Sequence, residues 1–98
     1  MTKIEIVTNI HKDTGVDKVD IKEIVEKFMS EIIGSLENGE NVYLRGFGSF
    51  IVKKKAAKMG RNITKGEPVF IPERYAPYFK PAKVFVKGVQ SKVKSLDN

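Results

Sequence analysis

The chain of 98 residues has no cysteine and no tryptophan, and His11 is its single histidine. The absence of cysteine excludes disulfides, thiolate metal sites and a cysteine nucleophile. A lone histidine without a thiol or a second imidazole cannot build a recognisable metal site or catalytic triad. We therefore interpret His11 as a surface or half-buried residue, and we expect no bound metal, no cofactor and no enzymatic activity.

Long hydrophobic runs are also missing. Apolar and polar residues alternate in the first dozen positions, and no unbroken apolar run reaches the length of a signal peptide or a membrane span. We expect a cytoplasmic protein that does not contact membranes. A chain this short forms a single domain with few side chains left for a core, so we also expect it to dimerise.

Acidic residues are scarce in the second half of the chain. Residues 1–50 carry six Lys or Arg against nine Asp or Glu, whereas residues 51–98 carry twelve against three. Residues 53–66, KKKAAKMGRNITKG, contain six of these cations and no carboxylate. This polar stretch lies between two strand-like runs, so we expect it to project into solvent as a basic hairpin arm that binds phosphate. The alternative is a solvated loop without a partner.

Residues 1–40 are predicted to form two helices. Thr2 fits the first position of a capping box, the first helix should run to about Asp13, and Gly15 should end it. Asp17 is a candidate N-cap for a second, longer helix, which should end at Asn38-Gly39 because glycine adopts the left-handed conformation there.

The second helix carries a wide apolar band. Its members are Ile21, Ile24, Val25, Phe28, Met29, Ile32, Ile33 and Leu36. The band is wider than the stripe that covering one sheet requires. We therefore expect the helix to pack on its own chain and on a partner subunit, with Phe28 and Ile32 in the dimer core. The alternative is that the band covers only the sheet of its own chain.

Residues 41–55 indicate a hairpin. Residues 42–44 suit a strand, Arg45-Gly46 suits a turn, and the following strand alternates apolar residues on one face. Leu44, Phe47 and Phe50 are predicted to be core anchors, although an aromatic run is also typical of platforms on which bases stack.

The arm is predicted to turn near residues 60–62, with Gly66 helping to reverse the ribbon. A return strand follows at residues 69–71, and Pro68 and Pro72 restrict it to edge or bulge geometry. A free two-stranded ribbon with six cations buries almost nothing. We therefore expect it to be mobile in isolation and to become ordered on its ligand.

The C-terminal segment should return to the body of the protein. Phe79 is predicted to join the core, and Pro81 suits the first position of a third helix. Its apolar face comprises Ala82, Phe85, Val86, Val89 and Val93, and separate from that face lie Lys80, Lys83, Lys87 and Lys94. These lysines form a second basic surface, for which a solvated helix face is the alternative interpretation.

Several motifs together resemble the signature of the HU and integration-host-factor family of bacterial DNA-bending proteins. They are GFGSF at 46–50, GRN at 60–62, Gly66 and FKPAK at 79–83. The similarity extends over essentially the whole chain without a gap. It implies that Phe47, Phe50 and Phe79 build a shared core, and that the backbone around Gly46 and Gly48 approaches phosphates closely.

The resemblance also implies an α+β fold in an intertwined dimer. Each chain would contribute two N-terminal helices, a three-stranded antiparallel sheet with a long protruding β-ribbon arm, and a short C-terminal helix. Residues 1–98 would form one DNA-binding domain. Within it, residues 1–40 would be the helical dimerisation base, 41–81 the sheet with the arm at about 53–75, and 82–95 the C-terminal helix.

The expected function is that of a non-catalytic architectural protein in the nucleoid. It would bind double-stranded DNA through minor-groove β-arms with low sequence specificity, bending and compacting chromosomal DNA. Its other partner would be a second copy of the chain, or a paralogue in a heterodimer. The candidate DNA-binding residues are Lys3, Gly46, Gly48, Lys53, Lys55, Lys58, Arg61, Asn62, Lys65, Arg74, Lys80, Lys83 and Lys87.

The arm tip departs from the family pattern. Proline typically follows Arg-Asn there, whereas this chain has Ile63, and Lys65 replaces a threonine. Apolar side chains other than proline also unstack base steps, so Ile63 is the candidate DNA wedge; alternatively it packs along the groove. The alternative function is that of a basic RNA-binding or nucleic-acid-coating protein that does not kink its ligand.

Overall fold

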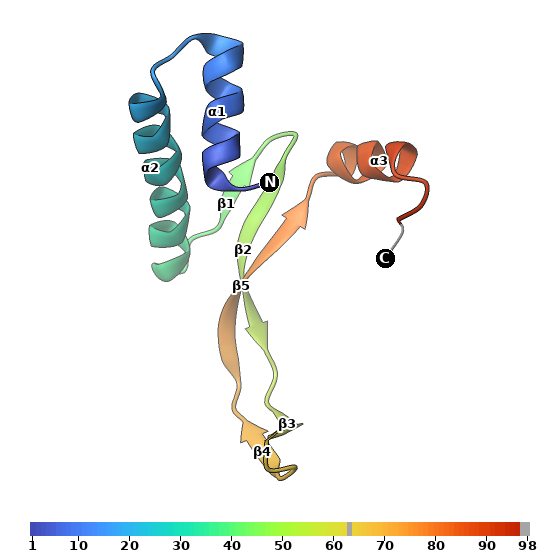
Figure 1. Ribbon diagram of the computed structural model, residues 1–98. Helices are drawn as coiled ribbons and strands as arrows, with labels where there is room; N and C mark the ends of the chain where they lie inside the picture. The colour runs from blue at the N-terminus through green and yellow to red at the C-terminus, as the bar shows by residue number, and fades with distance from the viewer. Residues whose placement is uncertain (63, 97–98) are drawn as a thin grey trace.

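The computed structural model describes residues 1–62 and 64–96. Two antiparallel helices, α1 (Lys3–Thr14) and α2 (Lys18–Glu37), lead into a small sheet, from which a long ribbon extends before the chain returns to a third helix (Figure 1). The ribbon points away from all three helices, so the molecule measures 54 × 38 × 30 Å. Among the described residues, no helix combines the length and the hydropathy that crossing a bilayer requires.

Both N-terminal helices begin and end at the predicted caps. The Thr2 hydroxyl accepts a hydrogen bond from a backbone N–H of the first turn of α1 at 3.3 Å, and Gly15, at φ 75°, ends that helix. The Asp17 carboxylate accepts a bond from the first turn of α2 at 3.1 Å. Gly39, at φ 78°, follows the last residue of α2 and its C-cap. These predictions are therefore confirmed.

The central sheet has three antiparallel strands in the order β1, β2, β5. Strand β1 (Val42–Leu44) and strand β5 (Arg74–Pro81) flank strand β2 (Gly48–Lys55). The register places Phe50 opposite both Val42 and Phe79. Paired residues of antiparallel strands point to the same face, so this register gathers the apolar side chains that meet the rest of the body.

The arm consists of two hydrogen-bonded pieces. Its base is the outer part of β2 and β5, and its distal piece is a separate two-stranded sheet of β3 (Lys58–Arg61) and β4 (Pro68–Ile71). Residues 56–57 and 72–73 separate the pieces, yet the register continues from Lys55 opposite Arg74 to Lys58 opposite Ile71. Pro72 has no N–H to donate, which explains an interruption at this position. We call residues 56–57 and 72–73 the arm joint.

The turn at the arm tip lies further along the chain than predicted. Gly60 and Arg61 belong to β3, the turn includes Thr64 and Lys65, and the N–H of Asn62 donates to the Glu67 carbonyl across it at 2.8 Å. A Cβ on Gly60 would lie 2.9 Å from the Ile71 side chain, so this glycine serves strand packing. The positive φ that the reversal needs falls on Gly66 instead, at 68°.

The third helix, α3 (Lys83–Lys92), begins after Pro81 and is shorter than the predicted segment 82–95. Pro81 was predicted to be the first helical residue, but it is the last residue of β5 and lies opposite Gly48. Strand pairing continues up to this point, and the N–H of Ala82 bonds the Phe47 carbonyl at 2.9 Å. A proline fits there because β5 is an edge strand.

Four phenylalanine rings form an aromatic cluster, in which Phe50 and Phe79 are half-buried while Phe47 and Phe85 are 45% and 37% exposed. The Phe79 ring lies 4.8 Å from that of Phe50 and 5.2 Å from that of Phe47 between centroids, and Phe85 of α3 stacks on Phe47 at 5.7 Å. The core roles predicted for the first three are consistent with these contacts. Phe85, which the sequence places only on a helix face, joins them because the start of α3 is tied to the turn that carries Phe47, whose carbonyl accepts a hydrogen bond from the N–H of Ala82 at 2.9 Å.

The chain alone leaves much apolar surface uncovered. Its accessible surface is 8452 Å², against about 5,600 Å² for a compact monomer of 11.0 kDa. Only Val7, Ile21 and Ile32 are buried apolar residues in the described part of the chain. Phe28, in the predicted dimer core, is 48% exposed, and Ile24 beside it is 64% exposed. The apolar band of α2 is therefore only partly covered by its own chain.

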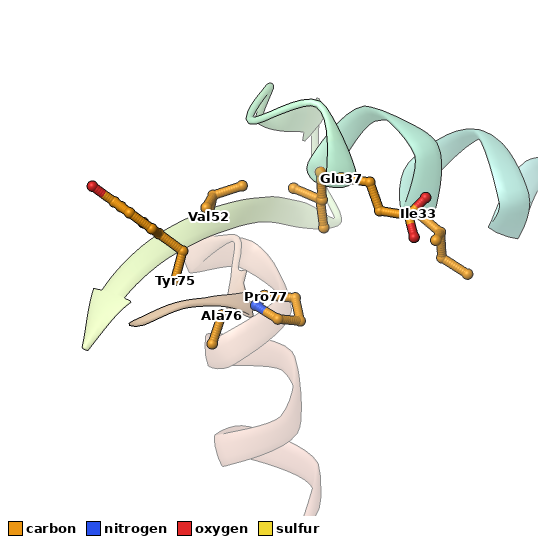
Figure 2. Close-up of a pocket in the computed structure, with 7 residues that line it drawn as sticks. Ile33, Glu37, Val52, Tyr75, Ala76 and Pro77 are labelled. Atoms are coloured by element: carbon orange, nitrogen blue, oxygen red, sulfur yellow. The ribbon is translucent and has the colours of Figure 1, made fainter. Parts of the chain in front are cut away.

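A hollow of about 400 Å³ separates the end of α2 from the base of the arm (Figure 2). Its lining residues are Ile33, Leu36, Glu37, Val52, Tyr75, Ala76 and Pro77. Tyr75 therefore lies on the side of the sheet that faces the helices, with its ring at the edge of this hollow.

Candidate nucleic-acid interface

The register divides the sheet into two chemically different faces. Phe50 and Phe79 define the face that packs on the body, which we call the inner face. Residues next to these in sequence point to the opposite side, because side chains alternate along a strand. This outer face carries Tyr43, Ser49, Ile51, Lys53, Lys55, Arg74, Ala76, Tyr78 and Lys80.

The outer face is cationic. It holds four basic side chains, and the three strands of the sheet contain no carboxylate. The Lys53 ammonium lies 4.6 Å from the centroid of the Tyr78 ring, which holds it on this face through a cation–π contact. The predicted phosphate contacts Lys53, Lys55, Arg74 and Lys80 are thus brought together by strand pairing. Arg74 is half-buried, and the other three are exposed.

Lys54 points to the other side of the sheet. Its ammonium forms an ion pair with the carboxylate of Glu73 in the arm joint at 3.2 Å. Both side chains are more than half exposed, so the pair contributes little to stability. Its consequence is electrostatic: the positive charge of Lys54 is compensated, whereas those of its neighbours Lys53 and Lys55 have no carboxylate on their own face.

The distal piece of the arm presents Lys58, Arg61 and Lys65 to solvent. Asn62 shapes the turn between its strands, because its side-chain oxygen accepts bonds from the N–H groups of Thr64 at 3.0 Å and Lys65 at 3.3 Å. Contacts of Arg61 and Asn62 with base edges remain predictions. The predicted wedge, Ile63, lies outside the described residues.

A second group of cations lies where β5 meets α3. Lys80 precedes the helix, and Lys83 and Lys87 are both exposed on it. Because they are four residues apart, Lys83 and Lys87 lie on one side of α3. Helix α3 contains no acidic residue. Three of the four predicted lysines are thus exposed at the end of β5 and on α3, while Lys94 lies beyond the last residue of the helix, and their binding role stays a prediction.

The two glycines predicted to approach phosphate have different environments. Gly46 is exposed in the turn between β1 and β2 at φ 81°, a conformation that other residues rarely adopt. Gly48 is buried, and a Cβ there would lie 2.6 Å from the Lys80 carbonyl oxygen and 2.7 Å from the Phe79 ring. Internal packing is thus sufficient to explain Gly48, while its contact with phosphate stays a prediction.

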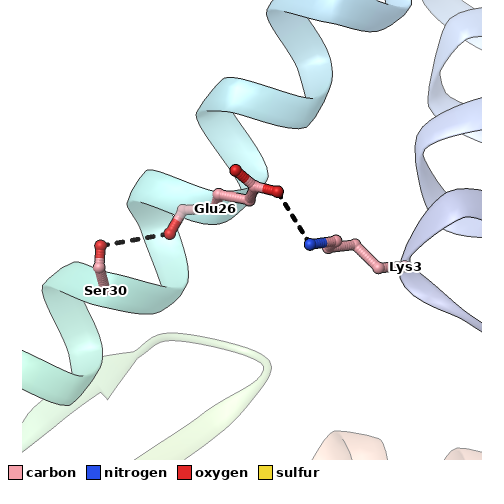
Figure 3. Close-up of polar contacts among 3 residues, drawn as sticks. All are labelled: Lys3, Glu26 and Ser30. Atoms are coloured by element: carbon pink, nitrogen blue, oxygen red, sulfur yellow. Dashed lines mark hydrogen bonds and ion pairs between the residues drawn. The ribbon is translucent and has the colours of Figure 1, made fainter.

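Lys3 connects the two N-terminal helices. Its ammonium bonds the Glu26 carboxylate at 2.8 Å, while the backbone carbonyl of Glu26 accepts a bond from the Ser30 hydroxyl at 3.3 Å (Figure 3). The hydrogen bond from Lys3 and its charge hold the pKa of Glu26 below its usual value. A role for Lys3 in DNA binding stays a prediction.

His11 of α1 contacts the loop that joins α1 to α2. Its Nδ1 lies 2.6 Å from the carbonyl oxygen of Val16, and the residue is half-buried between α1 and the loop to α2. Among residues 1–62 and 64–96, no three His, Asp or Glu side chains form a group that could hold a metal ion.

Sequence reasoning did not assign a role to the tyrosines of the outer face. Tyr78 positions Lys53, and Tyr43 lies on the same face of β1. Their positions depend on strand register, so no local pattern in the sequence could have grouped them.

Comparison with known proteins identifies relatives along nearly the whole chain. A family model described as bacterial DNA-binding protein matches residues 1–90. The chain is 41% identical to the DNA-binding protein HU of Thermotoga maritima over 90 residues, covering 92% of this chain and all of that protein. It is 44% identical to integration host factor subunit alpha of Glaesserella parasuis over 96 residues, covering 97% and 98% of the two chains.

A solved structure shares the fold. The cocrystal structure of Anabaena HU with DNA matches with a TM-score of 0.85 and 31% sequence identity, over 92% of this chain and 98% of that one. This match confirms the predicted α+β arrangement of helices, antiparallel sheet and protruding arm. The identities to HU and to an integration host factor subunit are similar, so they do not separate the two branches. The chain belongs to the bacterial DNA-binding protein family that contains HU and the integration host factor subunits.

Proposed function

We propose that this protein is a non-catalytic architectural protein that binds double-stranded DNA with low sequence specificity and bends it. One observation carries the proposal: strand register gathers Lys53, Lys55, Arg74 and Lys80 on one face, which continues into an arm with further exposed cations. A stripe of positive charge of this kind is complementary to the negative charge of a phosphate backbone. The family assignment supports the same function.

The arms would act in the minor groove. Its potential is strongly negative, and cations that enter it release counterions from the DNA. Arg61 and Asn62 would reach base edges, which distinguish little beyond A·T from G·C, so low specificity follows. Bending a short site costs about 1–6 kcal/mol, which phosphate contacts of Lys80, Lys83 and Lys87 would offset. Such a protein would be associated with the nucleoid.

The assembly that we propose is a homodimer. The half-exposed Phe28 and the uncovered band of α2 supply an apolar surface of the kind that a second copy covers. A heterodimer with a paralogue is the alternative. Sedimentation of the pure chain should give about twice the mass of 11.0 kDa. A monomeric mass at micromolar concentration would contradict the homodimer.

Ile63→Ala should largely abolish DNA bending. An apolar side chain at the arm tip is needed to unstack a base step, which costs roughly a few kcal/mol, and alanine is too small to fill the opened step. Fluorescence transfer between dyes at the two ends of a short duplex measures the bend. The wild-type protein should raise the transfer, and the Ile63→Ala variant should bind with little rise.

Ile63→Pro is the matched control, because proline is also an apolar wedge, and it should preserve the rise in transfer. If the wild-type protein binds without any rise, it coats the duplex and the wedge mechanism is wrong. Equal affinity for duplex RNA and duplex DNA would favour the RNA-binding alternative, because the A-form minor groove is wide and shallow.

A further inference from the structure

An apolar hollow of about 230 Å³ lies between α1 and α2, and we call it the helix groove. Ile4 of α1 and Val19 of α2 line it, and these side chains are 74% and 72% exposed. Val7, which is buried, lines it as well. Single exposed apolar residues are common on protein surfaces, but here two of them share a hollow with a buried apolar residue. The groove therefore offers apolar surface that a partner can cover.

The cations of the N-terminal half gather along this groove. Residues 1–50, all of which the structure describes, contain six Lys or Arg and nine Asp or Glu. Three of the lysines line the groove, whereas none of these nine carboxylates does. The three are Lys3, Lys18 and Lys22. The groove is thus a locally positive surface in the acidic half of the chain.

Two of the three charges are not compensated by ion pairs. The Lys3 ammonium bonds the Glu26 carboxylate of α2 at 2.8 Å (Figure 3). Lys18 and Lys22 are exposed, and neither forms an ion pair with another described residue. The carboxylate of Asp17, beside Lys18 in sequence, caps the start of α2. Because they are four residues apart, Lys18 and Lys22 lie on one side of the helix.

The groove lies away from the apolar residues that we assign to the dimer. Successive residues of an α-helix are turned by about 100°, so Val19 lies about 140° from Ile24 and about 180° from Phe28 around α2. A second copy that covers Ile24 and Phe28 therefore leaves the helix groove accessible.

The size and charge of the groove indicate the kind of partner that it fits. Small-molecule sites usually enclose about 300–1,000 Å³, so this smaller hollow suits one or two side chains of a protein. Amphipathic helices bind grooves through apolar side chains at positions i, i+3, i+4 and i+7. Carboxylates beside those positions would complement Lys18 and Lys22. The phosphates of a duplex would also pair with these lysines, but they would leave Ile4 and Val19 uncovered.

We propose that the helix groove binds an acidic amphipathic helix of another protein. Apolar side chains of that helix would cover Ile4 and Val19, and its carboxylates would pair with Lys18 and Lys22. The contact goes beyond the proposed DNA bending, because the bending mechanism uses none of these four residues. The protein would then recruit a partner to DNA through its helical base while its arms stay on the duplex.

A synthetic helical peptide tests the proposal. It has about 18 residues, which is long enough to form a helix in water, with leucines along one face and glutamates beside them. In two-dimensional ¹H–¹⁵N NMR spectra of the full chain, the peptide should shift the amide signals of Val7, Val19 and Lys22. No detectable binding at about 1 mM peptide, an affinity of roughly 4 kcal/mol, would contradict the proposal. Shifts confined to the arm would show attraction by net charge alone and would also overturn it.

Val19→Ala should weaken peptide binding about fivefold, because it removes two methyl groups from the contact. Val84→Ala is the matched control, since Val84 is 67% exposed on α3 and lies outside the groove. It should leave the affinity for the peptide unchanged. Equal losses for the two variants would overturn the proposed contact.

Lys22→Glu should weaken binding of the acidic peptide about fivefold, the effect of one exposed ion pair. Lys12→Glu changes the net charge equally at an exposed position of α1 outside the groove, so it should have less than about a twofold effect. A peptide with lysine in place of each glutamate should bind Lys22→Glu more tightly than the wild-type protein. Equal effects of the two substitutions would show that net charge governs binding, against the proposal.

Two further outcomes would assign the groove to a different occupant. If Val19→Ala weakens duplex binding as much as peptide binding, DNA occupies the groove. If the wild-type protein sediments above the mass of a dimer and Val19→Ala restores the dimer, another copy of the chain covers it. Either result would overturn the proposal, while the bend measured with Ile63→Ala is independent of both.

Discussion

Replacing Phe79 by alanine should destabilise the folded protein by about 3 kcal/mol, the lower end of the usual cost of deleting a core phenylalanine, because Phe79 is half-buried. Its ring contacts those of Phe50 and Phe47 at centroid distances of 4.8 and 5.2 Å, so it joins two strands of the core. Domains of this size are stable by only about 5–15 kcal/mol, so the substitution removes a large share of the total.

Urea unfolding followed by circular dichroism at a fixed protein concentration measures this effect. Phe70→Ala is the matched control, because Phe70 lies on the distal piece of the arm and is 63% exposed. A surface substitution of this kind changes stability by less than about 0.5 kcal/mol. Equal losses for the two variants would contradict a stabilising role of the aromatic cluster described above.

Removing three arm lysines together should weaken duplex binding by two to three orders of magnitude at roughly 0.1 M salt. The variant is Lys55→Ala/Lys58→Ala/Lys65→Ala, and all three side chains are exposed. Each lost phosphate contact also lowers the slope of log affinity against log salt by about 1, so the slope should fall by about 3 for each arm. Anisotropy titrations over a range of salt concentrations measure both quantities, and an unchanged slope would exclude phosphate contacts.

Two neighbouring lysines, Lys54 and Lys55, separate the effect of position from the effect of net charge. Lys55→Ala and Lys54→Ala change the net charge equally, but Lys55 lies on the outer face and Lys54 pairs with Glu73 on the other face. Lys55→Ala should therefore weaken binding several-fold and lower the slope by about 1, whereas Lys54→Ala should have less than about a twofold effect. Equal losses would show that net charge, and not the position of the lysines, governs affinity.

The features that the sequence predicted well are those with local causes. Helix ends depend on caps such as Thr2, Asp17 and Gly15, whose side chains or backbone conformations act within one turn. The return strand of the arm follows from its apolar residues between two prolines. The basic arm itself follows from charge density, because a run of six cations cannot enter a core.

The features that the sequence predicted poorly depend on pairing between distant segments. Gly60 looked like a turn residue, but its place opposite Val69 makes it part of a strand. Pro81 looked like a helix start, but pairing with Gly48 extends the strand through it. The separation of Lys54 from its two neighbours, and the grouping of Tyr43 with Tyr78, likewise require the register of three strands. A one-residue shift of a strand in that register would move its side chains to the opposite face.

The arm joint should affect the rate at which the protein dissociates from DNA. Because residues 56–57 and 72–73 divide the ribbon, the cations of the distal piece and those of the basal piece belong to separate hydrogen-bonded units. We expect dissociation from DNA to proceed stepwise, so that one unit dissociates while the other stays bound. A competing duplex would then occupy the vacated positions before release is complete. The residence time on a crowded chromosome would therefore be shorter than the equilibrium affinity implies.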